Sequence, residues 1–159
     1  EIGMFVVDTH ILIYSADKDS PNHGRCRALL EQWRAQATPW YVTWGIVYEF
    51  LRVVTHPRVL MHPLPSSHAW LFLDALFAAP QLRILTETDR HRHVAAEVFA
   101  EIPDISGNLV FDAHTAVLMR ENGIRVIYTR DTDFNRFPFL DTIDPITENR
   151  RTTKSNGRH

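Results

Sequence analysis

The stretch Met4-Phe5-Val6-Val7-Asp8-Thr9 decides how the rest of the chain is interpreted. Four apolar residues that favour β-structure end at a carboxylate, which predicts a short, fully buried strand. Similar short runs predict further strands at Trp40–Thr43, Leu82–Leu85 and Arg125–Thr129, and a short edge strand at Leu140–Ile143. The sequence therefore predicts a sheet of four or five strands.

Helical patterns separate these runs. Residues 109–122 carry apolar side chains at helical spacing and are followed by Gly123, a residue that commonly terminates helices. Other helices are expected after Ser20-Pro21 and at residues 46–54, 67–79 and 86–101. Short buried strands that alternate with helices predict an α/β protein, with a mainly parallel central sheet between two helical layers in a three-layer α/β/α, Rossmann-like arrangement.

The composition describes a single folded domain of modest charge. The chain has 159 residues, of which 45% are hydrophobic and 23% are charged, and these values exclude a chain that is disordered throughout. The 17 basic and 19 acidic side chains give a net charge of −2, which excludes binding of nucleic acid by bulk positive charge alone. A local basic face is compatible with these numbers.

We expect the folded domain to cover residues 4–148. Residues 149–159 are basic and lack apolar side chains, which predicts a disordered tail, and residues 1–3 are interpreted as a vector-derived remnant. The single cysteine, Cys26, excludes a disulfide within the chain. With no apolar run of membrane-spanning length and no signal-peptide pattern, the sequence predicts a cytoplasmic protein without a membrane partner.

Acidic residues are placed where a site of an α/β protein would form. The carboxyl ends of parallel strands meet at one edge of the sheet, and ligands bind there. The acids that lie at such ends, or in the helices beside them, are Asp8, Glu49, Asp112, Asp131 and Asp133. Taken singly, each is also compatible with a turn, a helix cap or a solvated helix position.

Taken together, the five carboxylates favour a bound cation. Two unit charges about 4 Å apart cost on the order of 4 kcal/mol at an effective dielectric constant of 20, and a whole domain has a stability of only about 5–15 kcal/mol. Such a cluster must take up protons or bind a cation. Oxygen ligands alone suit Mg²⁺ or Mn²⁺, and an ion held in this way can activate water and neutralise charge on a phosphodiester.

Other patterns give weaker indications. No glycine-rich phosphate loop follows the first strand, which argues against a dinucleotide-binding or P-loop function. The nine histidines do not predict zinc, because His91 and His93 are two positions apart and would lie on different faces of a helix. Arg130 and Arg136 flank the Asp-rich turn, where they could contact phosphates or pair with the acids.

Four segments, in this order and spacing, are similar to motifs of a known family. They are residues 6–14 (VVDTHILIY), 48–53 (YEFLRV), 107–114 (GNLVFDAH) and 129–134 (TRDTDF). Residues 4–146 thereby resemble a PIN domain and, within that family, the VapC-type toxin ribonucleases of type II toxin–antitoxin systems. The resemblance implies an α/β/α fold and a Mg²⁺- or Mn²⁺-dependent endoribonuclease.

The resemblance also implies roles for particular residues and partners. The catalytic acids would be Asp8, Glu49, Asp112 and Asp131, and the metal ligands would be these four together with Asp133. Thr9 and Thr129 would support them, and candidates for RNA contact are His10, Arg130 and Arg136. The family commonly has Asn where this chain has His10, a departure that concerns a supporting contact rather than the ligand set. Members of the family form homodimers and are silenced by a cognate antitoxin, and the apolar helix at 67–79 is a candidate for either contact surface.

Three functions remain open from the sequence. The first is RNA hydrolysis that leaves a 5′-phosphate and a 3′-hydroxyl, as the resemblance implies. The second is another Mg²⁺-dependent phosphoester hydrolysis, although phosphatases resembling the haloacid dehalogenases need a second Asp where this chain has His10. The third is a catalytically weak module that binds RNA or a partner, for which Asp8→Asn would leave cellular toxicity intact.

Overall fold

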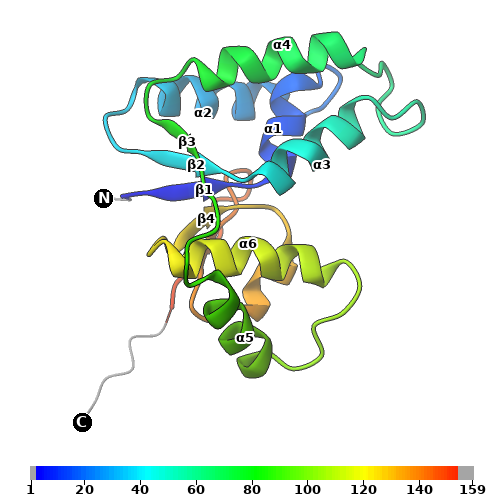
Figure 1. The fold of residues 1–159 in the computed structure, drawn as a ribbon. Helices are drawn as coiled ribbons and strands as arrows, with labels where there is room; N and C mark the ends of the chain where they lie inside the picture. The colour runs from blue at the N-terminus through cyan, green and yellow to red at the C-terminus, as the bar shows by residue number, and fades with distance from the viewer. Residues whose placement is uncertain (1–2, 154–159) are drawn as a thin grey trace.

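The computed structural model, which describes residues 3–153, contains one six-stranded sheet in the order β3-β2-β1-β4-β5-β6 (Figure 1). The strands are β1 (Phe5–Val7), β2 (Trp40–Val42), β3 (Leu82–Ile84), β4 (Val126–Tyr128), β5 (Asp141–Ile143) and β6 (Arg150–Arg151). The first five are parallel, and β6 runs antiparallel to β5. The mainly parallel sheet is confirmed, but it has six strands rather than four or five.

Helices cover both faces of this sheet, which confirms the three-layer arrangement (Figure 1). One layer contains α1 (Thr9–Ala16), α2 (His23–Ala35), α3 (Trp44–Val54) and α4 (Ser66–Phe77). The opposite layer contains α5 (His91–Glu101) and α6 (Leu109–Glu121), with the short 3₁₀ helix η1 (Thr132–Arg136) against α6. Over residues 3–153, no helix is long and apolar enough to cross a membrane.

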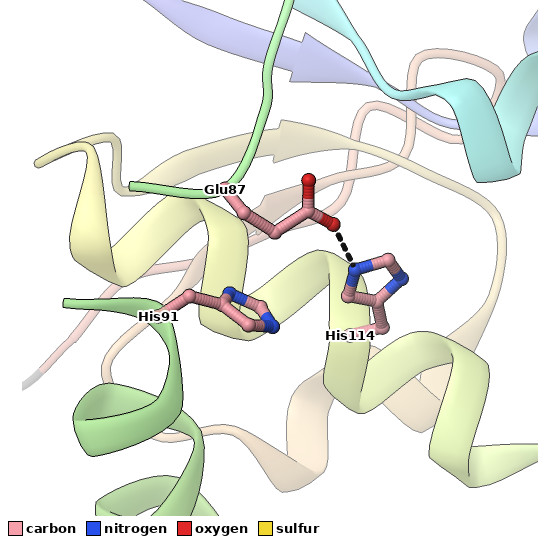
Figure 2. A group of neighbouring side chains, drawn as sticks. All are labelled: Glu87, His91 and His114. Carbon is pink, nitrogen blue, oxygen red and sulfur yellow. Dashed lines mark hydrogen bonds and ion pairs between the residues drawn. The ribbon is translucent and has the colours of Figure 1, made fainter. Parts of the chain in front are cut away.

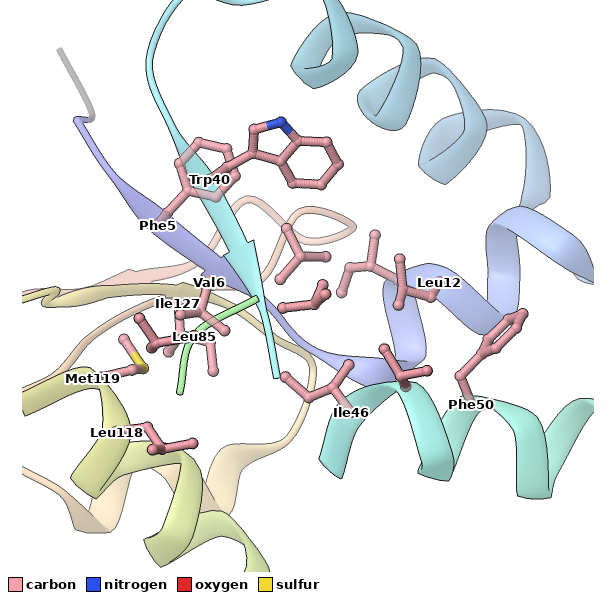
Figure 3. Close-up of a cluster of buried hydrophobic side chains, with 14 of the residues drawn as sticks. Phe5, Val6, Leu12, Trp40, Ile46, Phe50, Leu85, Leu118, Met119 and Ile127 are labelled. Atoms are coloured by element: carbon pink, nitrogen blue, oxygen red, sulfur yellow. The ribbon is translucent and has the colours of Figure 1, made fainter. Parts of the chain in front are cut away.

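The hydrophobic core lies on both sides of the sheet because the central strands are buried on both faces (Figure 3). Val6 and Ile127 lie side by side in β1 and β4. Leu12 and Phe50 pack from the α1–α3 layer, and Leu118, with Met119, packs from α6. Each fully buried side chain of this size stabilises the fold by about 1.5–3 kcal/mol, so the two layers are held to the sheet by apolar burial.

Two segments differ from the sequence prediction. Helix α1 was not predicted, because its eight residues THILIYSA are apolar on nearly every face and carry no helical periodicity. The segment after residue 148 is not a disordered tail over its whole length, since Arg150 and Arg151 form β6. The Arg151 guanidinium donates hydrogen bonds to the carbonyls of Phe137 (3.1 Å) and Leu140 (3.2 Å), which explains the order. Residues 154–159 of the predicted tail, and residues 1–2 of the predicted remnant, lie outside the described residues.

The strand order places a crevice at the centre of the sheet. Strand β1 lies between β2 and β4, so the chain leaves β1 toward one side first and returns to its other side only with β4. In open parallel sheets, ligands bind outside the carboxyl ends of the strands at such a point of reversal. Asp8 follows β1 directly, and Thr129 follows β4. The fold therefore predicts a site between these two residues.

Candidate active site

Asp8 is the most buried acid of the site. It lies between β1 and α1 with only 7% of its surface exposed. Its Oδ2 atom accepts a hydrogen bond of 2.6 Å from the Thr129 hydroxyl. Burial raises the pKa of Asp8, Glu49 adds to the rise, and the hydrogen bond from Thr129 opposes it. The carboxylate is thus held in one orientation in surroundings that disfavour its charge.

Thr129 joins Asp8 to the turn that follows β4. Its hydroxyl oxygen also accepts a hydrogen bond of 2.9 Å from the Asp131 amide. Asp131 in turn caps η1, because its Oδ1 atom accepts a hydrogen bond of 2.9 Å from the Asp133 amide. One buried hydroxyl therefore fixes the positions of two acids that are more than a hundred residues apart in the sequence.

Asp112 completes the negative cluster from the first turn of α6. Carboxylate oxygens of Asp112, Asp131 and Asp133 all lie within 4.8 Å of one another. Burial, and then the charges of Asp131, Asp8, Asp133 and Glu49 in that order, raise the pKa of Asp112 to about 7. The site thus holds more negative charge than its own surroundings neutralise.

Glu49 reaches the site from α3 on the other side of the sheet. Its Oε2 atom accepts a hydrogen bond of 3.2 Å from the Thr9 hydroxyl, and its Oε1 atom is 3.9 Å from the Arg52 guanidinium. Thr9, which is buried beside Asp8, therefore links the start of α1 to α3. Both residues predicted to support the site, Thr9 and Thr129, contact acids in this way.

All five predicted acids line one cavity of about 750 Å³. We call them the acidic cluster: Asp8, Glu49, Asp112, Asp131 and Asp133. The basic side chains that line the same cavity are Arg52 and His114. Hard carboxylate oxygens in excess, some of them with raised pKa values, are a donor set that fits a divalent cation such as Mg²⁺ or Mn²⁺. The structure thus brings together the acids that the sequence singled out.

The predicted RNA-contacting residues are placed differently. Arg130 directs its Nε atom to Asp144 Oδ2 at 3.3 Å, and Arg136 donates a hydrogen bond of 3.2 Å to the Pro103 carbonyl. His10 is exposed near Tyr14, with 6.1 Å between the ring centroids. In the described part of the chain, none of the three lines the cavity. The alternative that these arginines pair with the acids of the Asp-rich turn does not hold either, since their partners are Asp144 and the Pro103 carbonyl.

Sequence reasoning missed three side chains that line the cavity. Arg52 lies one helical turn after Glu49, and that spacing is the signal that would have found it. Tyr48 and Phe111 are each the neighbour of a cluster acid and are 64% and 72% exposed. Large exposed aromatic side chains at the rim of a polar cavity are unusual and indicate a binding surface.

Fold and site together define a class of protein. Residues 5–140 match the family model of the PIN domain, and the chain belongs to the PIN domain family. It is 33% identical over 140 residues to ribonuclease VapC48 of Mycobacterium tuberculosis, a match that covers 88% of this chain and 96% of that protein. It is also 33% identical over 143 residues to ribonuclease VapC43 of the same organism, covering 90% of this chain and 96% of that protein.

Solved structures agree with this fold at lower sequence identity. VapBC2 from Rickettsia felis, bound to a DNA fragment from its promoter, matches with a TM-score of 0.63 at 17% identity. The match covers 87% of this chain and 96% of the VapBC2 chain. VapC20 of Mycobacterium tuberculosis, described as a toxin that cleaves the sarcin-ricin loop, has a TM-score of 0.58 at 18% identity, covering 82% and 92%. At these identities the structures support the architecture.

Proposed function

We propose that this chain is a divalent-cation-dependent endoribonuclease and the toxin of a toxin–antitoxin pair. The observation that carries the proposal is the convergence of five carboxylates on one cavity, where burial and the charges of the other four acids raise the pKa of Asp112 to about 7. The relatives named VapC ribonucleases support the reaction class. Since Mg²⁺ and Mn²⁺ prefer the same oxygen ligands, both serve the proposed site.

The chain's own residues have distinct tasks in this reaction. Asp8, Asp112, Asp131 and Asp133 would hold the cation, and Glu49 would accept a proton from the attacking water at its Oε1 or Oε2 atom. The bound ion would acidify water and neutralise charge on the scissile phosphate. Water oxygen bonds to phosphorus, the P–O3′ bond breaks, and O3′ takes a proton from solvent water, so that a 5′-phosphate and a 3′-hydroxyl remain. Thr129 and Thr9 are positioning residues that hold Asp8 and Glu49.

Two exposed aromatic rings support RNA as the substrate. Tyr48 and Phe111 flank the acidic cluster and expose most of their side chains at the cavity. Proteins that read single-stranded RNA stack unpaired bases on such rings. Arg52 supplies a positive charge in the same cavity, where a backbone phosphate would lie. These contacts favour an unpaired segment of RNA, for which we propose a cytoplasmic site of action.

Cleavage of total RNA by the purified protein tests the proposal. Wild type is compared with Asp8→Asn in Mg²⁺, in Mn²⁺ and with EDTA. We expect discrete fragments that depend on the metal, and a loss of at least about 100-fold in Asp8→Asn, the scale seen when one group that stabilises transition-state charge is removed. The fragments should accept a label from polynucleotide kinase only after phosphatase treatment, because their 5′ ends carry phosphate.

The matched control is Asp74→Asn, an exposed acid of α4 that should leave cleavage unchanged. Circular dichroism of each variant shows whether the fold is retained. Folded wild type that cleaves no RNA with either metal contradicts the proposal and favours a small phosphoester substrate or a binding module.

We propose further that the chain forms a homodimer and binds an antitoxin, and that α4 contributes to these contacts. The VapBC2 assembly of Rickettsia felis supports a partner protein. On α4, Trp70 and Leu71 are 39% and 64% exposed, whereas Phe72 stacks on Phe50 with 5.2 Å between ring centroids. A charge at Phe72 would disturb the core, so the surface is better tested at Leu71.

Leu71→Glu should shift the protein toward monomer in sedimentation experiments or weaken capture of the co-expressed antitoxin. The control is Val59→Glu, at an apolar residue that is 54% exposed outside α4. If Leu71→Glu changes neither assembly, α4 does not contribute to the contact surfaces.

A further inference from the structure

A second group of metal-ligating side chains lies beside the acidic cluster. Glu87, His91 and His114 each place one ligand atom so that the three atoms lie within 4.8 Å of one another. The residues come from the segment before α5, from the first turn of α5 and from α6, and Figure 2 shows their side chains converging between these elements. We call these three residues the histidine group.

Contacts within the histidine group already orient its members. His114 Nε2 is 2.9 Å from Glu87 Oε1, the contact drawn in Figure 2. The rings of His91 and His114 meet edge to face, with 5.6 Å between their centroids. Imidazole nitrogens from two helices and a carboxylate oxygen therefore face the same small volume.

A buried carboxylate behind His91 indicates more than a surface ion pair. Glu121 Oε1 is 2.7 Å from His91 Nδ1, and the Glu121 side chain has no exposed surface. The same carboxylate accepts a hydrogen bond of 2.9 Å from the Thr88 hydroxyl. With Nδ1 engaged in this way, Nε2 of His91 is left to bind a ligand. A carboxylate that holds the far nitrogen of an imidazole is the arrangement found behind histidines that bind metals.

We propose that Glu87, His91 and His114 form a binding site for a transition-metal ion of the Zn²⁺ type, distinct from the acidic cluster. Two imidazoles and one carboxylate match three-ligand zinc sites, in which water completes the tetrahedron. Zinc bonds of about 2.0–2.1 Å place ligand atoms about 3.3 Å apart. Glu87 Oε1 and His114 Nε2 are already 2.9 Å apart, and all three ligand atoms lie within 4.8 Å of one another, so small side-chain movements would bring them to these distances.

The site would tie α6 to the segment that precedes α5. Glu87 and His91 belong to that segment and the start of α5, and His114 lies on the helix that carries Asp112. His114 also lines the cavity of the acidic cluster. A bound ion therefore cross-links two elements at the wall of the proposed active site and adds positive charge there. Nitrogen ligands favour Zn²⁺ here, whereas the oxygen-only acidic cluster favours Mg²⁺.

Zinc titration of the metal-stripped chain, in excess Mg²⁺ so that the acidic cluster is occupied, tests the site. Calorimetry and competition with a chromogenic chelator should give one Zn²⁺ per chain. His91→Gln should weaken this binding by more than about 100-fold, and Glu121→Gln, which leaves all three ligands in place, by about 10- to 100-fold. Zinc should also raise the melting temperature of wild type and not of His91→Gln.

His93→Gln is the matched control, because His93 lies on the same helix, is exposed and pairs with Glu97 at 2.9 Å. Zinc affinity should be unchanged in this variant. Unchanged affinity in His91→Gln, an equal loss in His93→Gln, or a loss in Asp112→Asn with His91→Gln unaffected would each overturn the proposal. RNA cleavage is not a readout here, so the outcome is independent of the proposed nuclease activity.

Discussion

Helix α6 contributes Asp112 to the acidic cluster and His114, half a turn further on, to the histidine group. The effect of the neighbouring charges is opposite at these two residues. Burial and the neighbouring carboxylates raise the pKa of Asp112 to about 7, whereas His114 Nε2 lies 2.9 Å from the carboxylate of Glu87. The histidine group is internally paired, but the acidic cluster repels itself and is balanced only when a cation binds.

This difference separates a site that depends on its ion from one that does not. Repulsion among the carboxylates of the acidic cluster lowers the stability of the metal-free fold, and a divalent cation that relieves this repulsion is bound strongly. The side chains of the histidine group have hydrogen-bond partners without an ion. A bound ion would therefore stabilise the protein by its own bonds to the ligands, and not by removing charge repulsion. Three experiments test whether the two groups differ in this way.

The largest effect is expected from Mg²⁺ itself. An ion present at about 100 times its dissociation constant stabilises the folded state by about 2.7 kcal/mol, which corresponds to roughly 5–10 °C in melting temperature for a chain of this size. Asp131→Asn should lose most of this shift, and His91→Gln should keep it. Differential scanning calorimetry with Mg²⁺ and with EDTA measures both, and equal losses in the two variants would contradict the separation of the sites.

An intermediate effect is expected at the threonines that orient each group. Thr129→Val leaves Asp8 and the Asp131 amide without their buried partner, and should destabilise the protein by about 1–3 kcal/mol and slow RNA cleavage. Thr88→Val removes one hydrogen bond to Glu121, which keeps its contacts with His91 and the Thr88 amide, and should cost less than about 1 kcal/mol. Urea unfolding measures both costs, and Thr129→Ser, which keeps the hydroxyl, should stay near wild type. An equal loss of stability in Thr129→Val and Thr88→Val would contradict the expected difference between the two groups.

The smallest effect has opposite signs at the two groups. The pKa of Asp112 is raised, so its charge destabilises the metal-free protein increasingly as pH rises from about 4 through 7. Asp112→Asn should therefore stabilise that protein at pH 8, by about 1 kcal/mol because solvent screens part of the repulsion, and the gain should vanish near pH 4. The pKa of Glu87 is lowered by its own backbone amide and by His114, so Glu87→Gln should slightly destabilise the protein above pH 5. Thermal unfolding in EDTA between pH 4 and pH 8 measures the stability of both variants. An increase in stability at high pH in both would contradict the expected opposite signs.

Much of the acidic cluster could be predicted because its order in the chain follows the strands. Asp8 and Asp131 come just after β1 and β4, and a parallel sheet brings such positions to one edge.

The helix α1 could not be found, because eight residues that are apolar on nearly every face show no period. The histidine group was missed because Glu87 and His114 are 27 residues apart and meet only through the packing of α5 on α6. Arg130 was assigned to RNA from its place beside the Asp-rich turn, but its direction toward Asp144 is set by the tertiary structure.

The position of β4 in the sheet has a consequence for the timing of synthesis. Because β1 is completed on one side by β4, Asp8 gains Thr129 and Asp131 as neighbours only after the chain has been made to that point. At about 5–20 residues per second, the ribosome needs about 6–25 s to pass from Asp8 to Asp131. A nascent chain therefore cannot bring Asp8 beside Asp131 before β4 has been made, and the acidic cluster assembles only after that point.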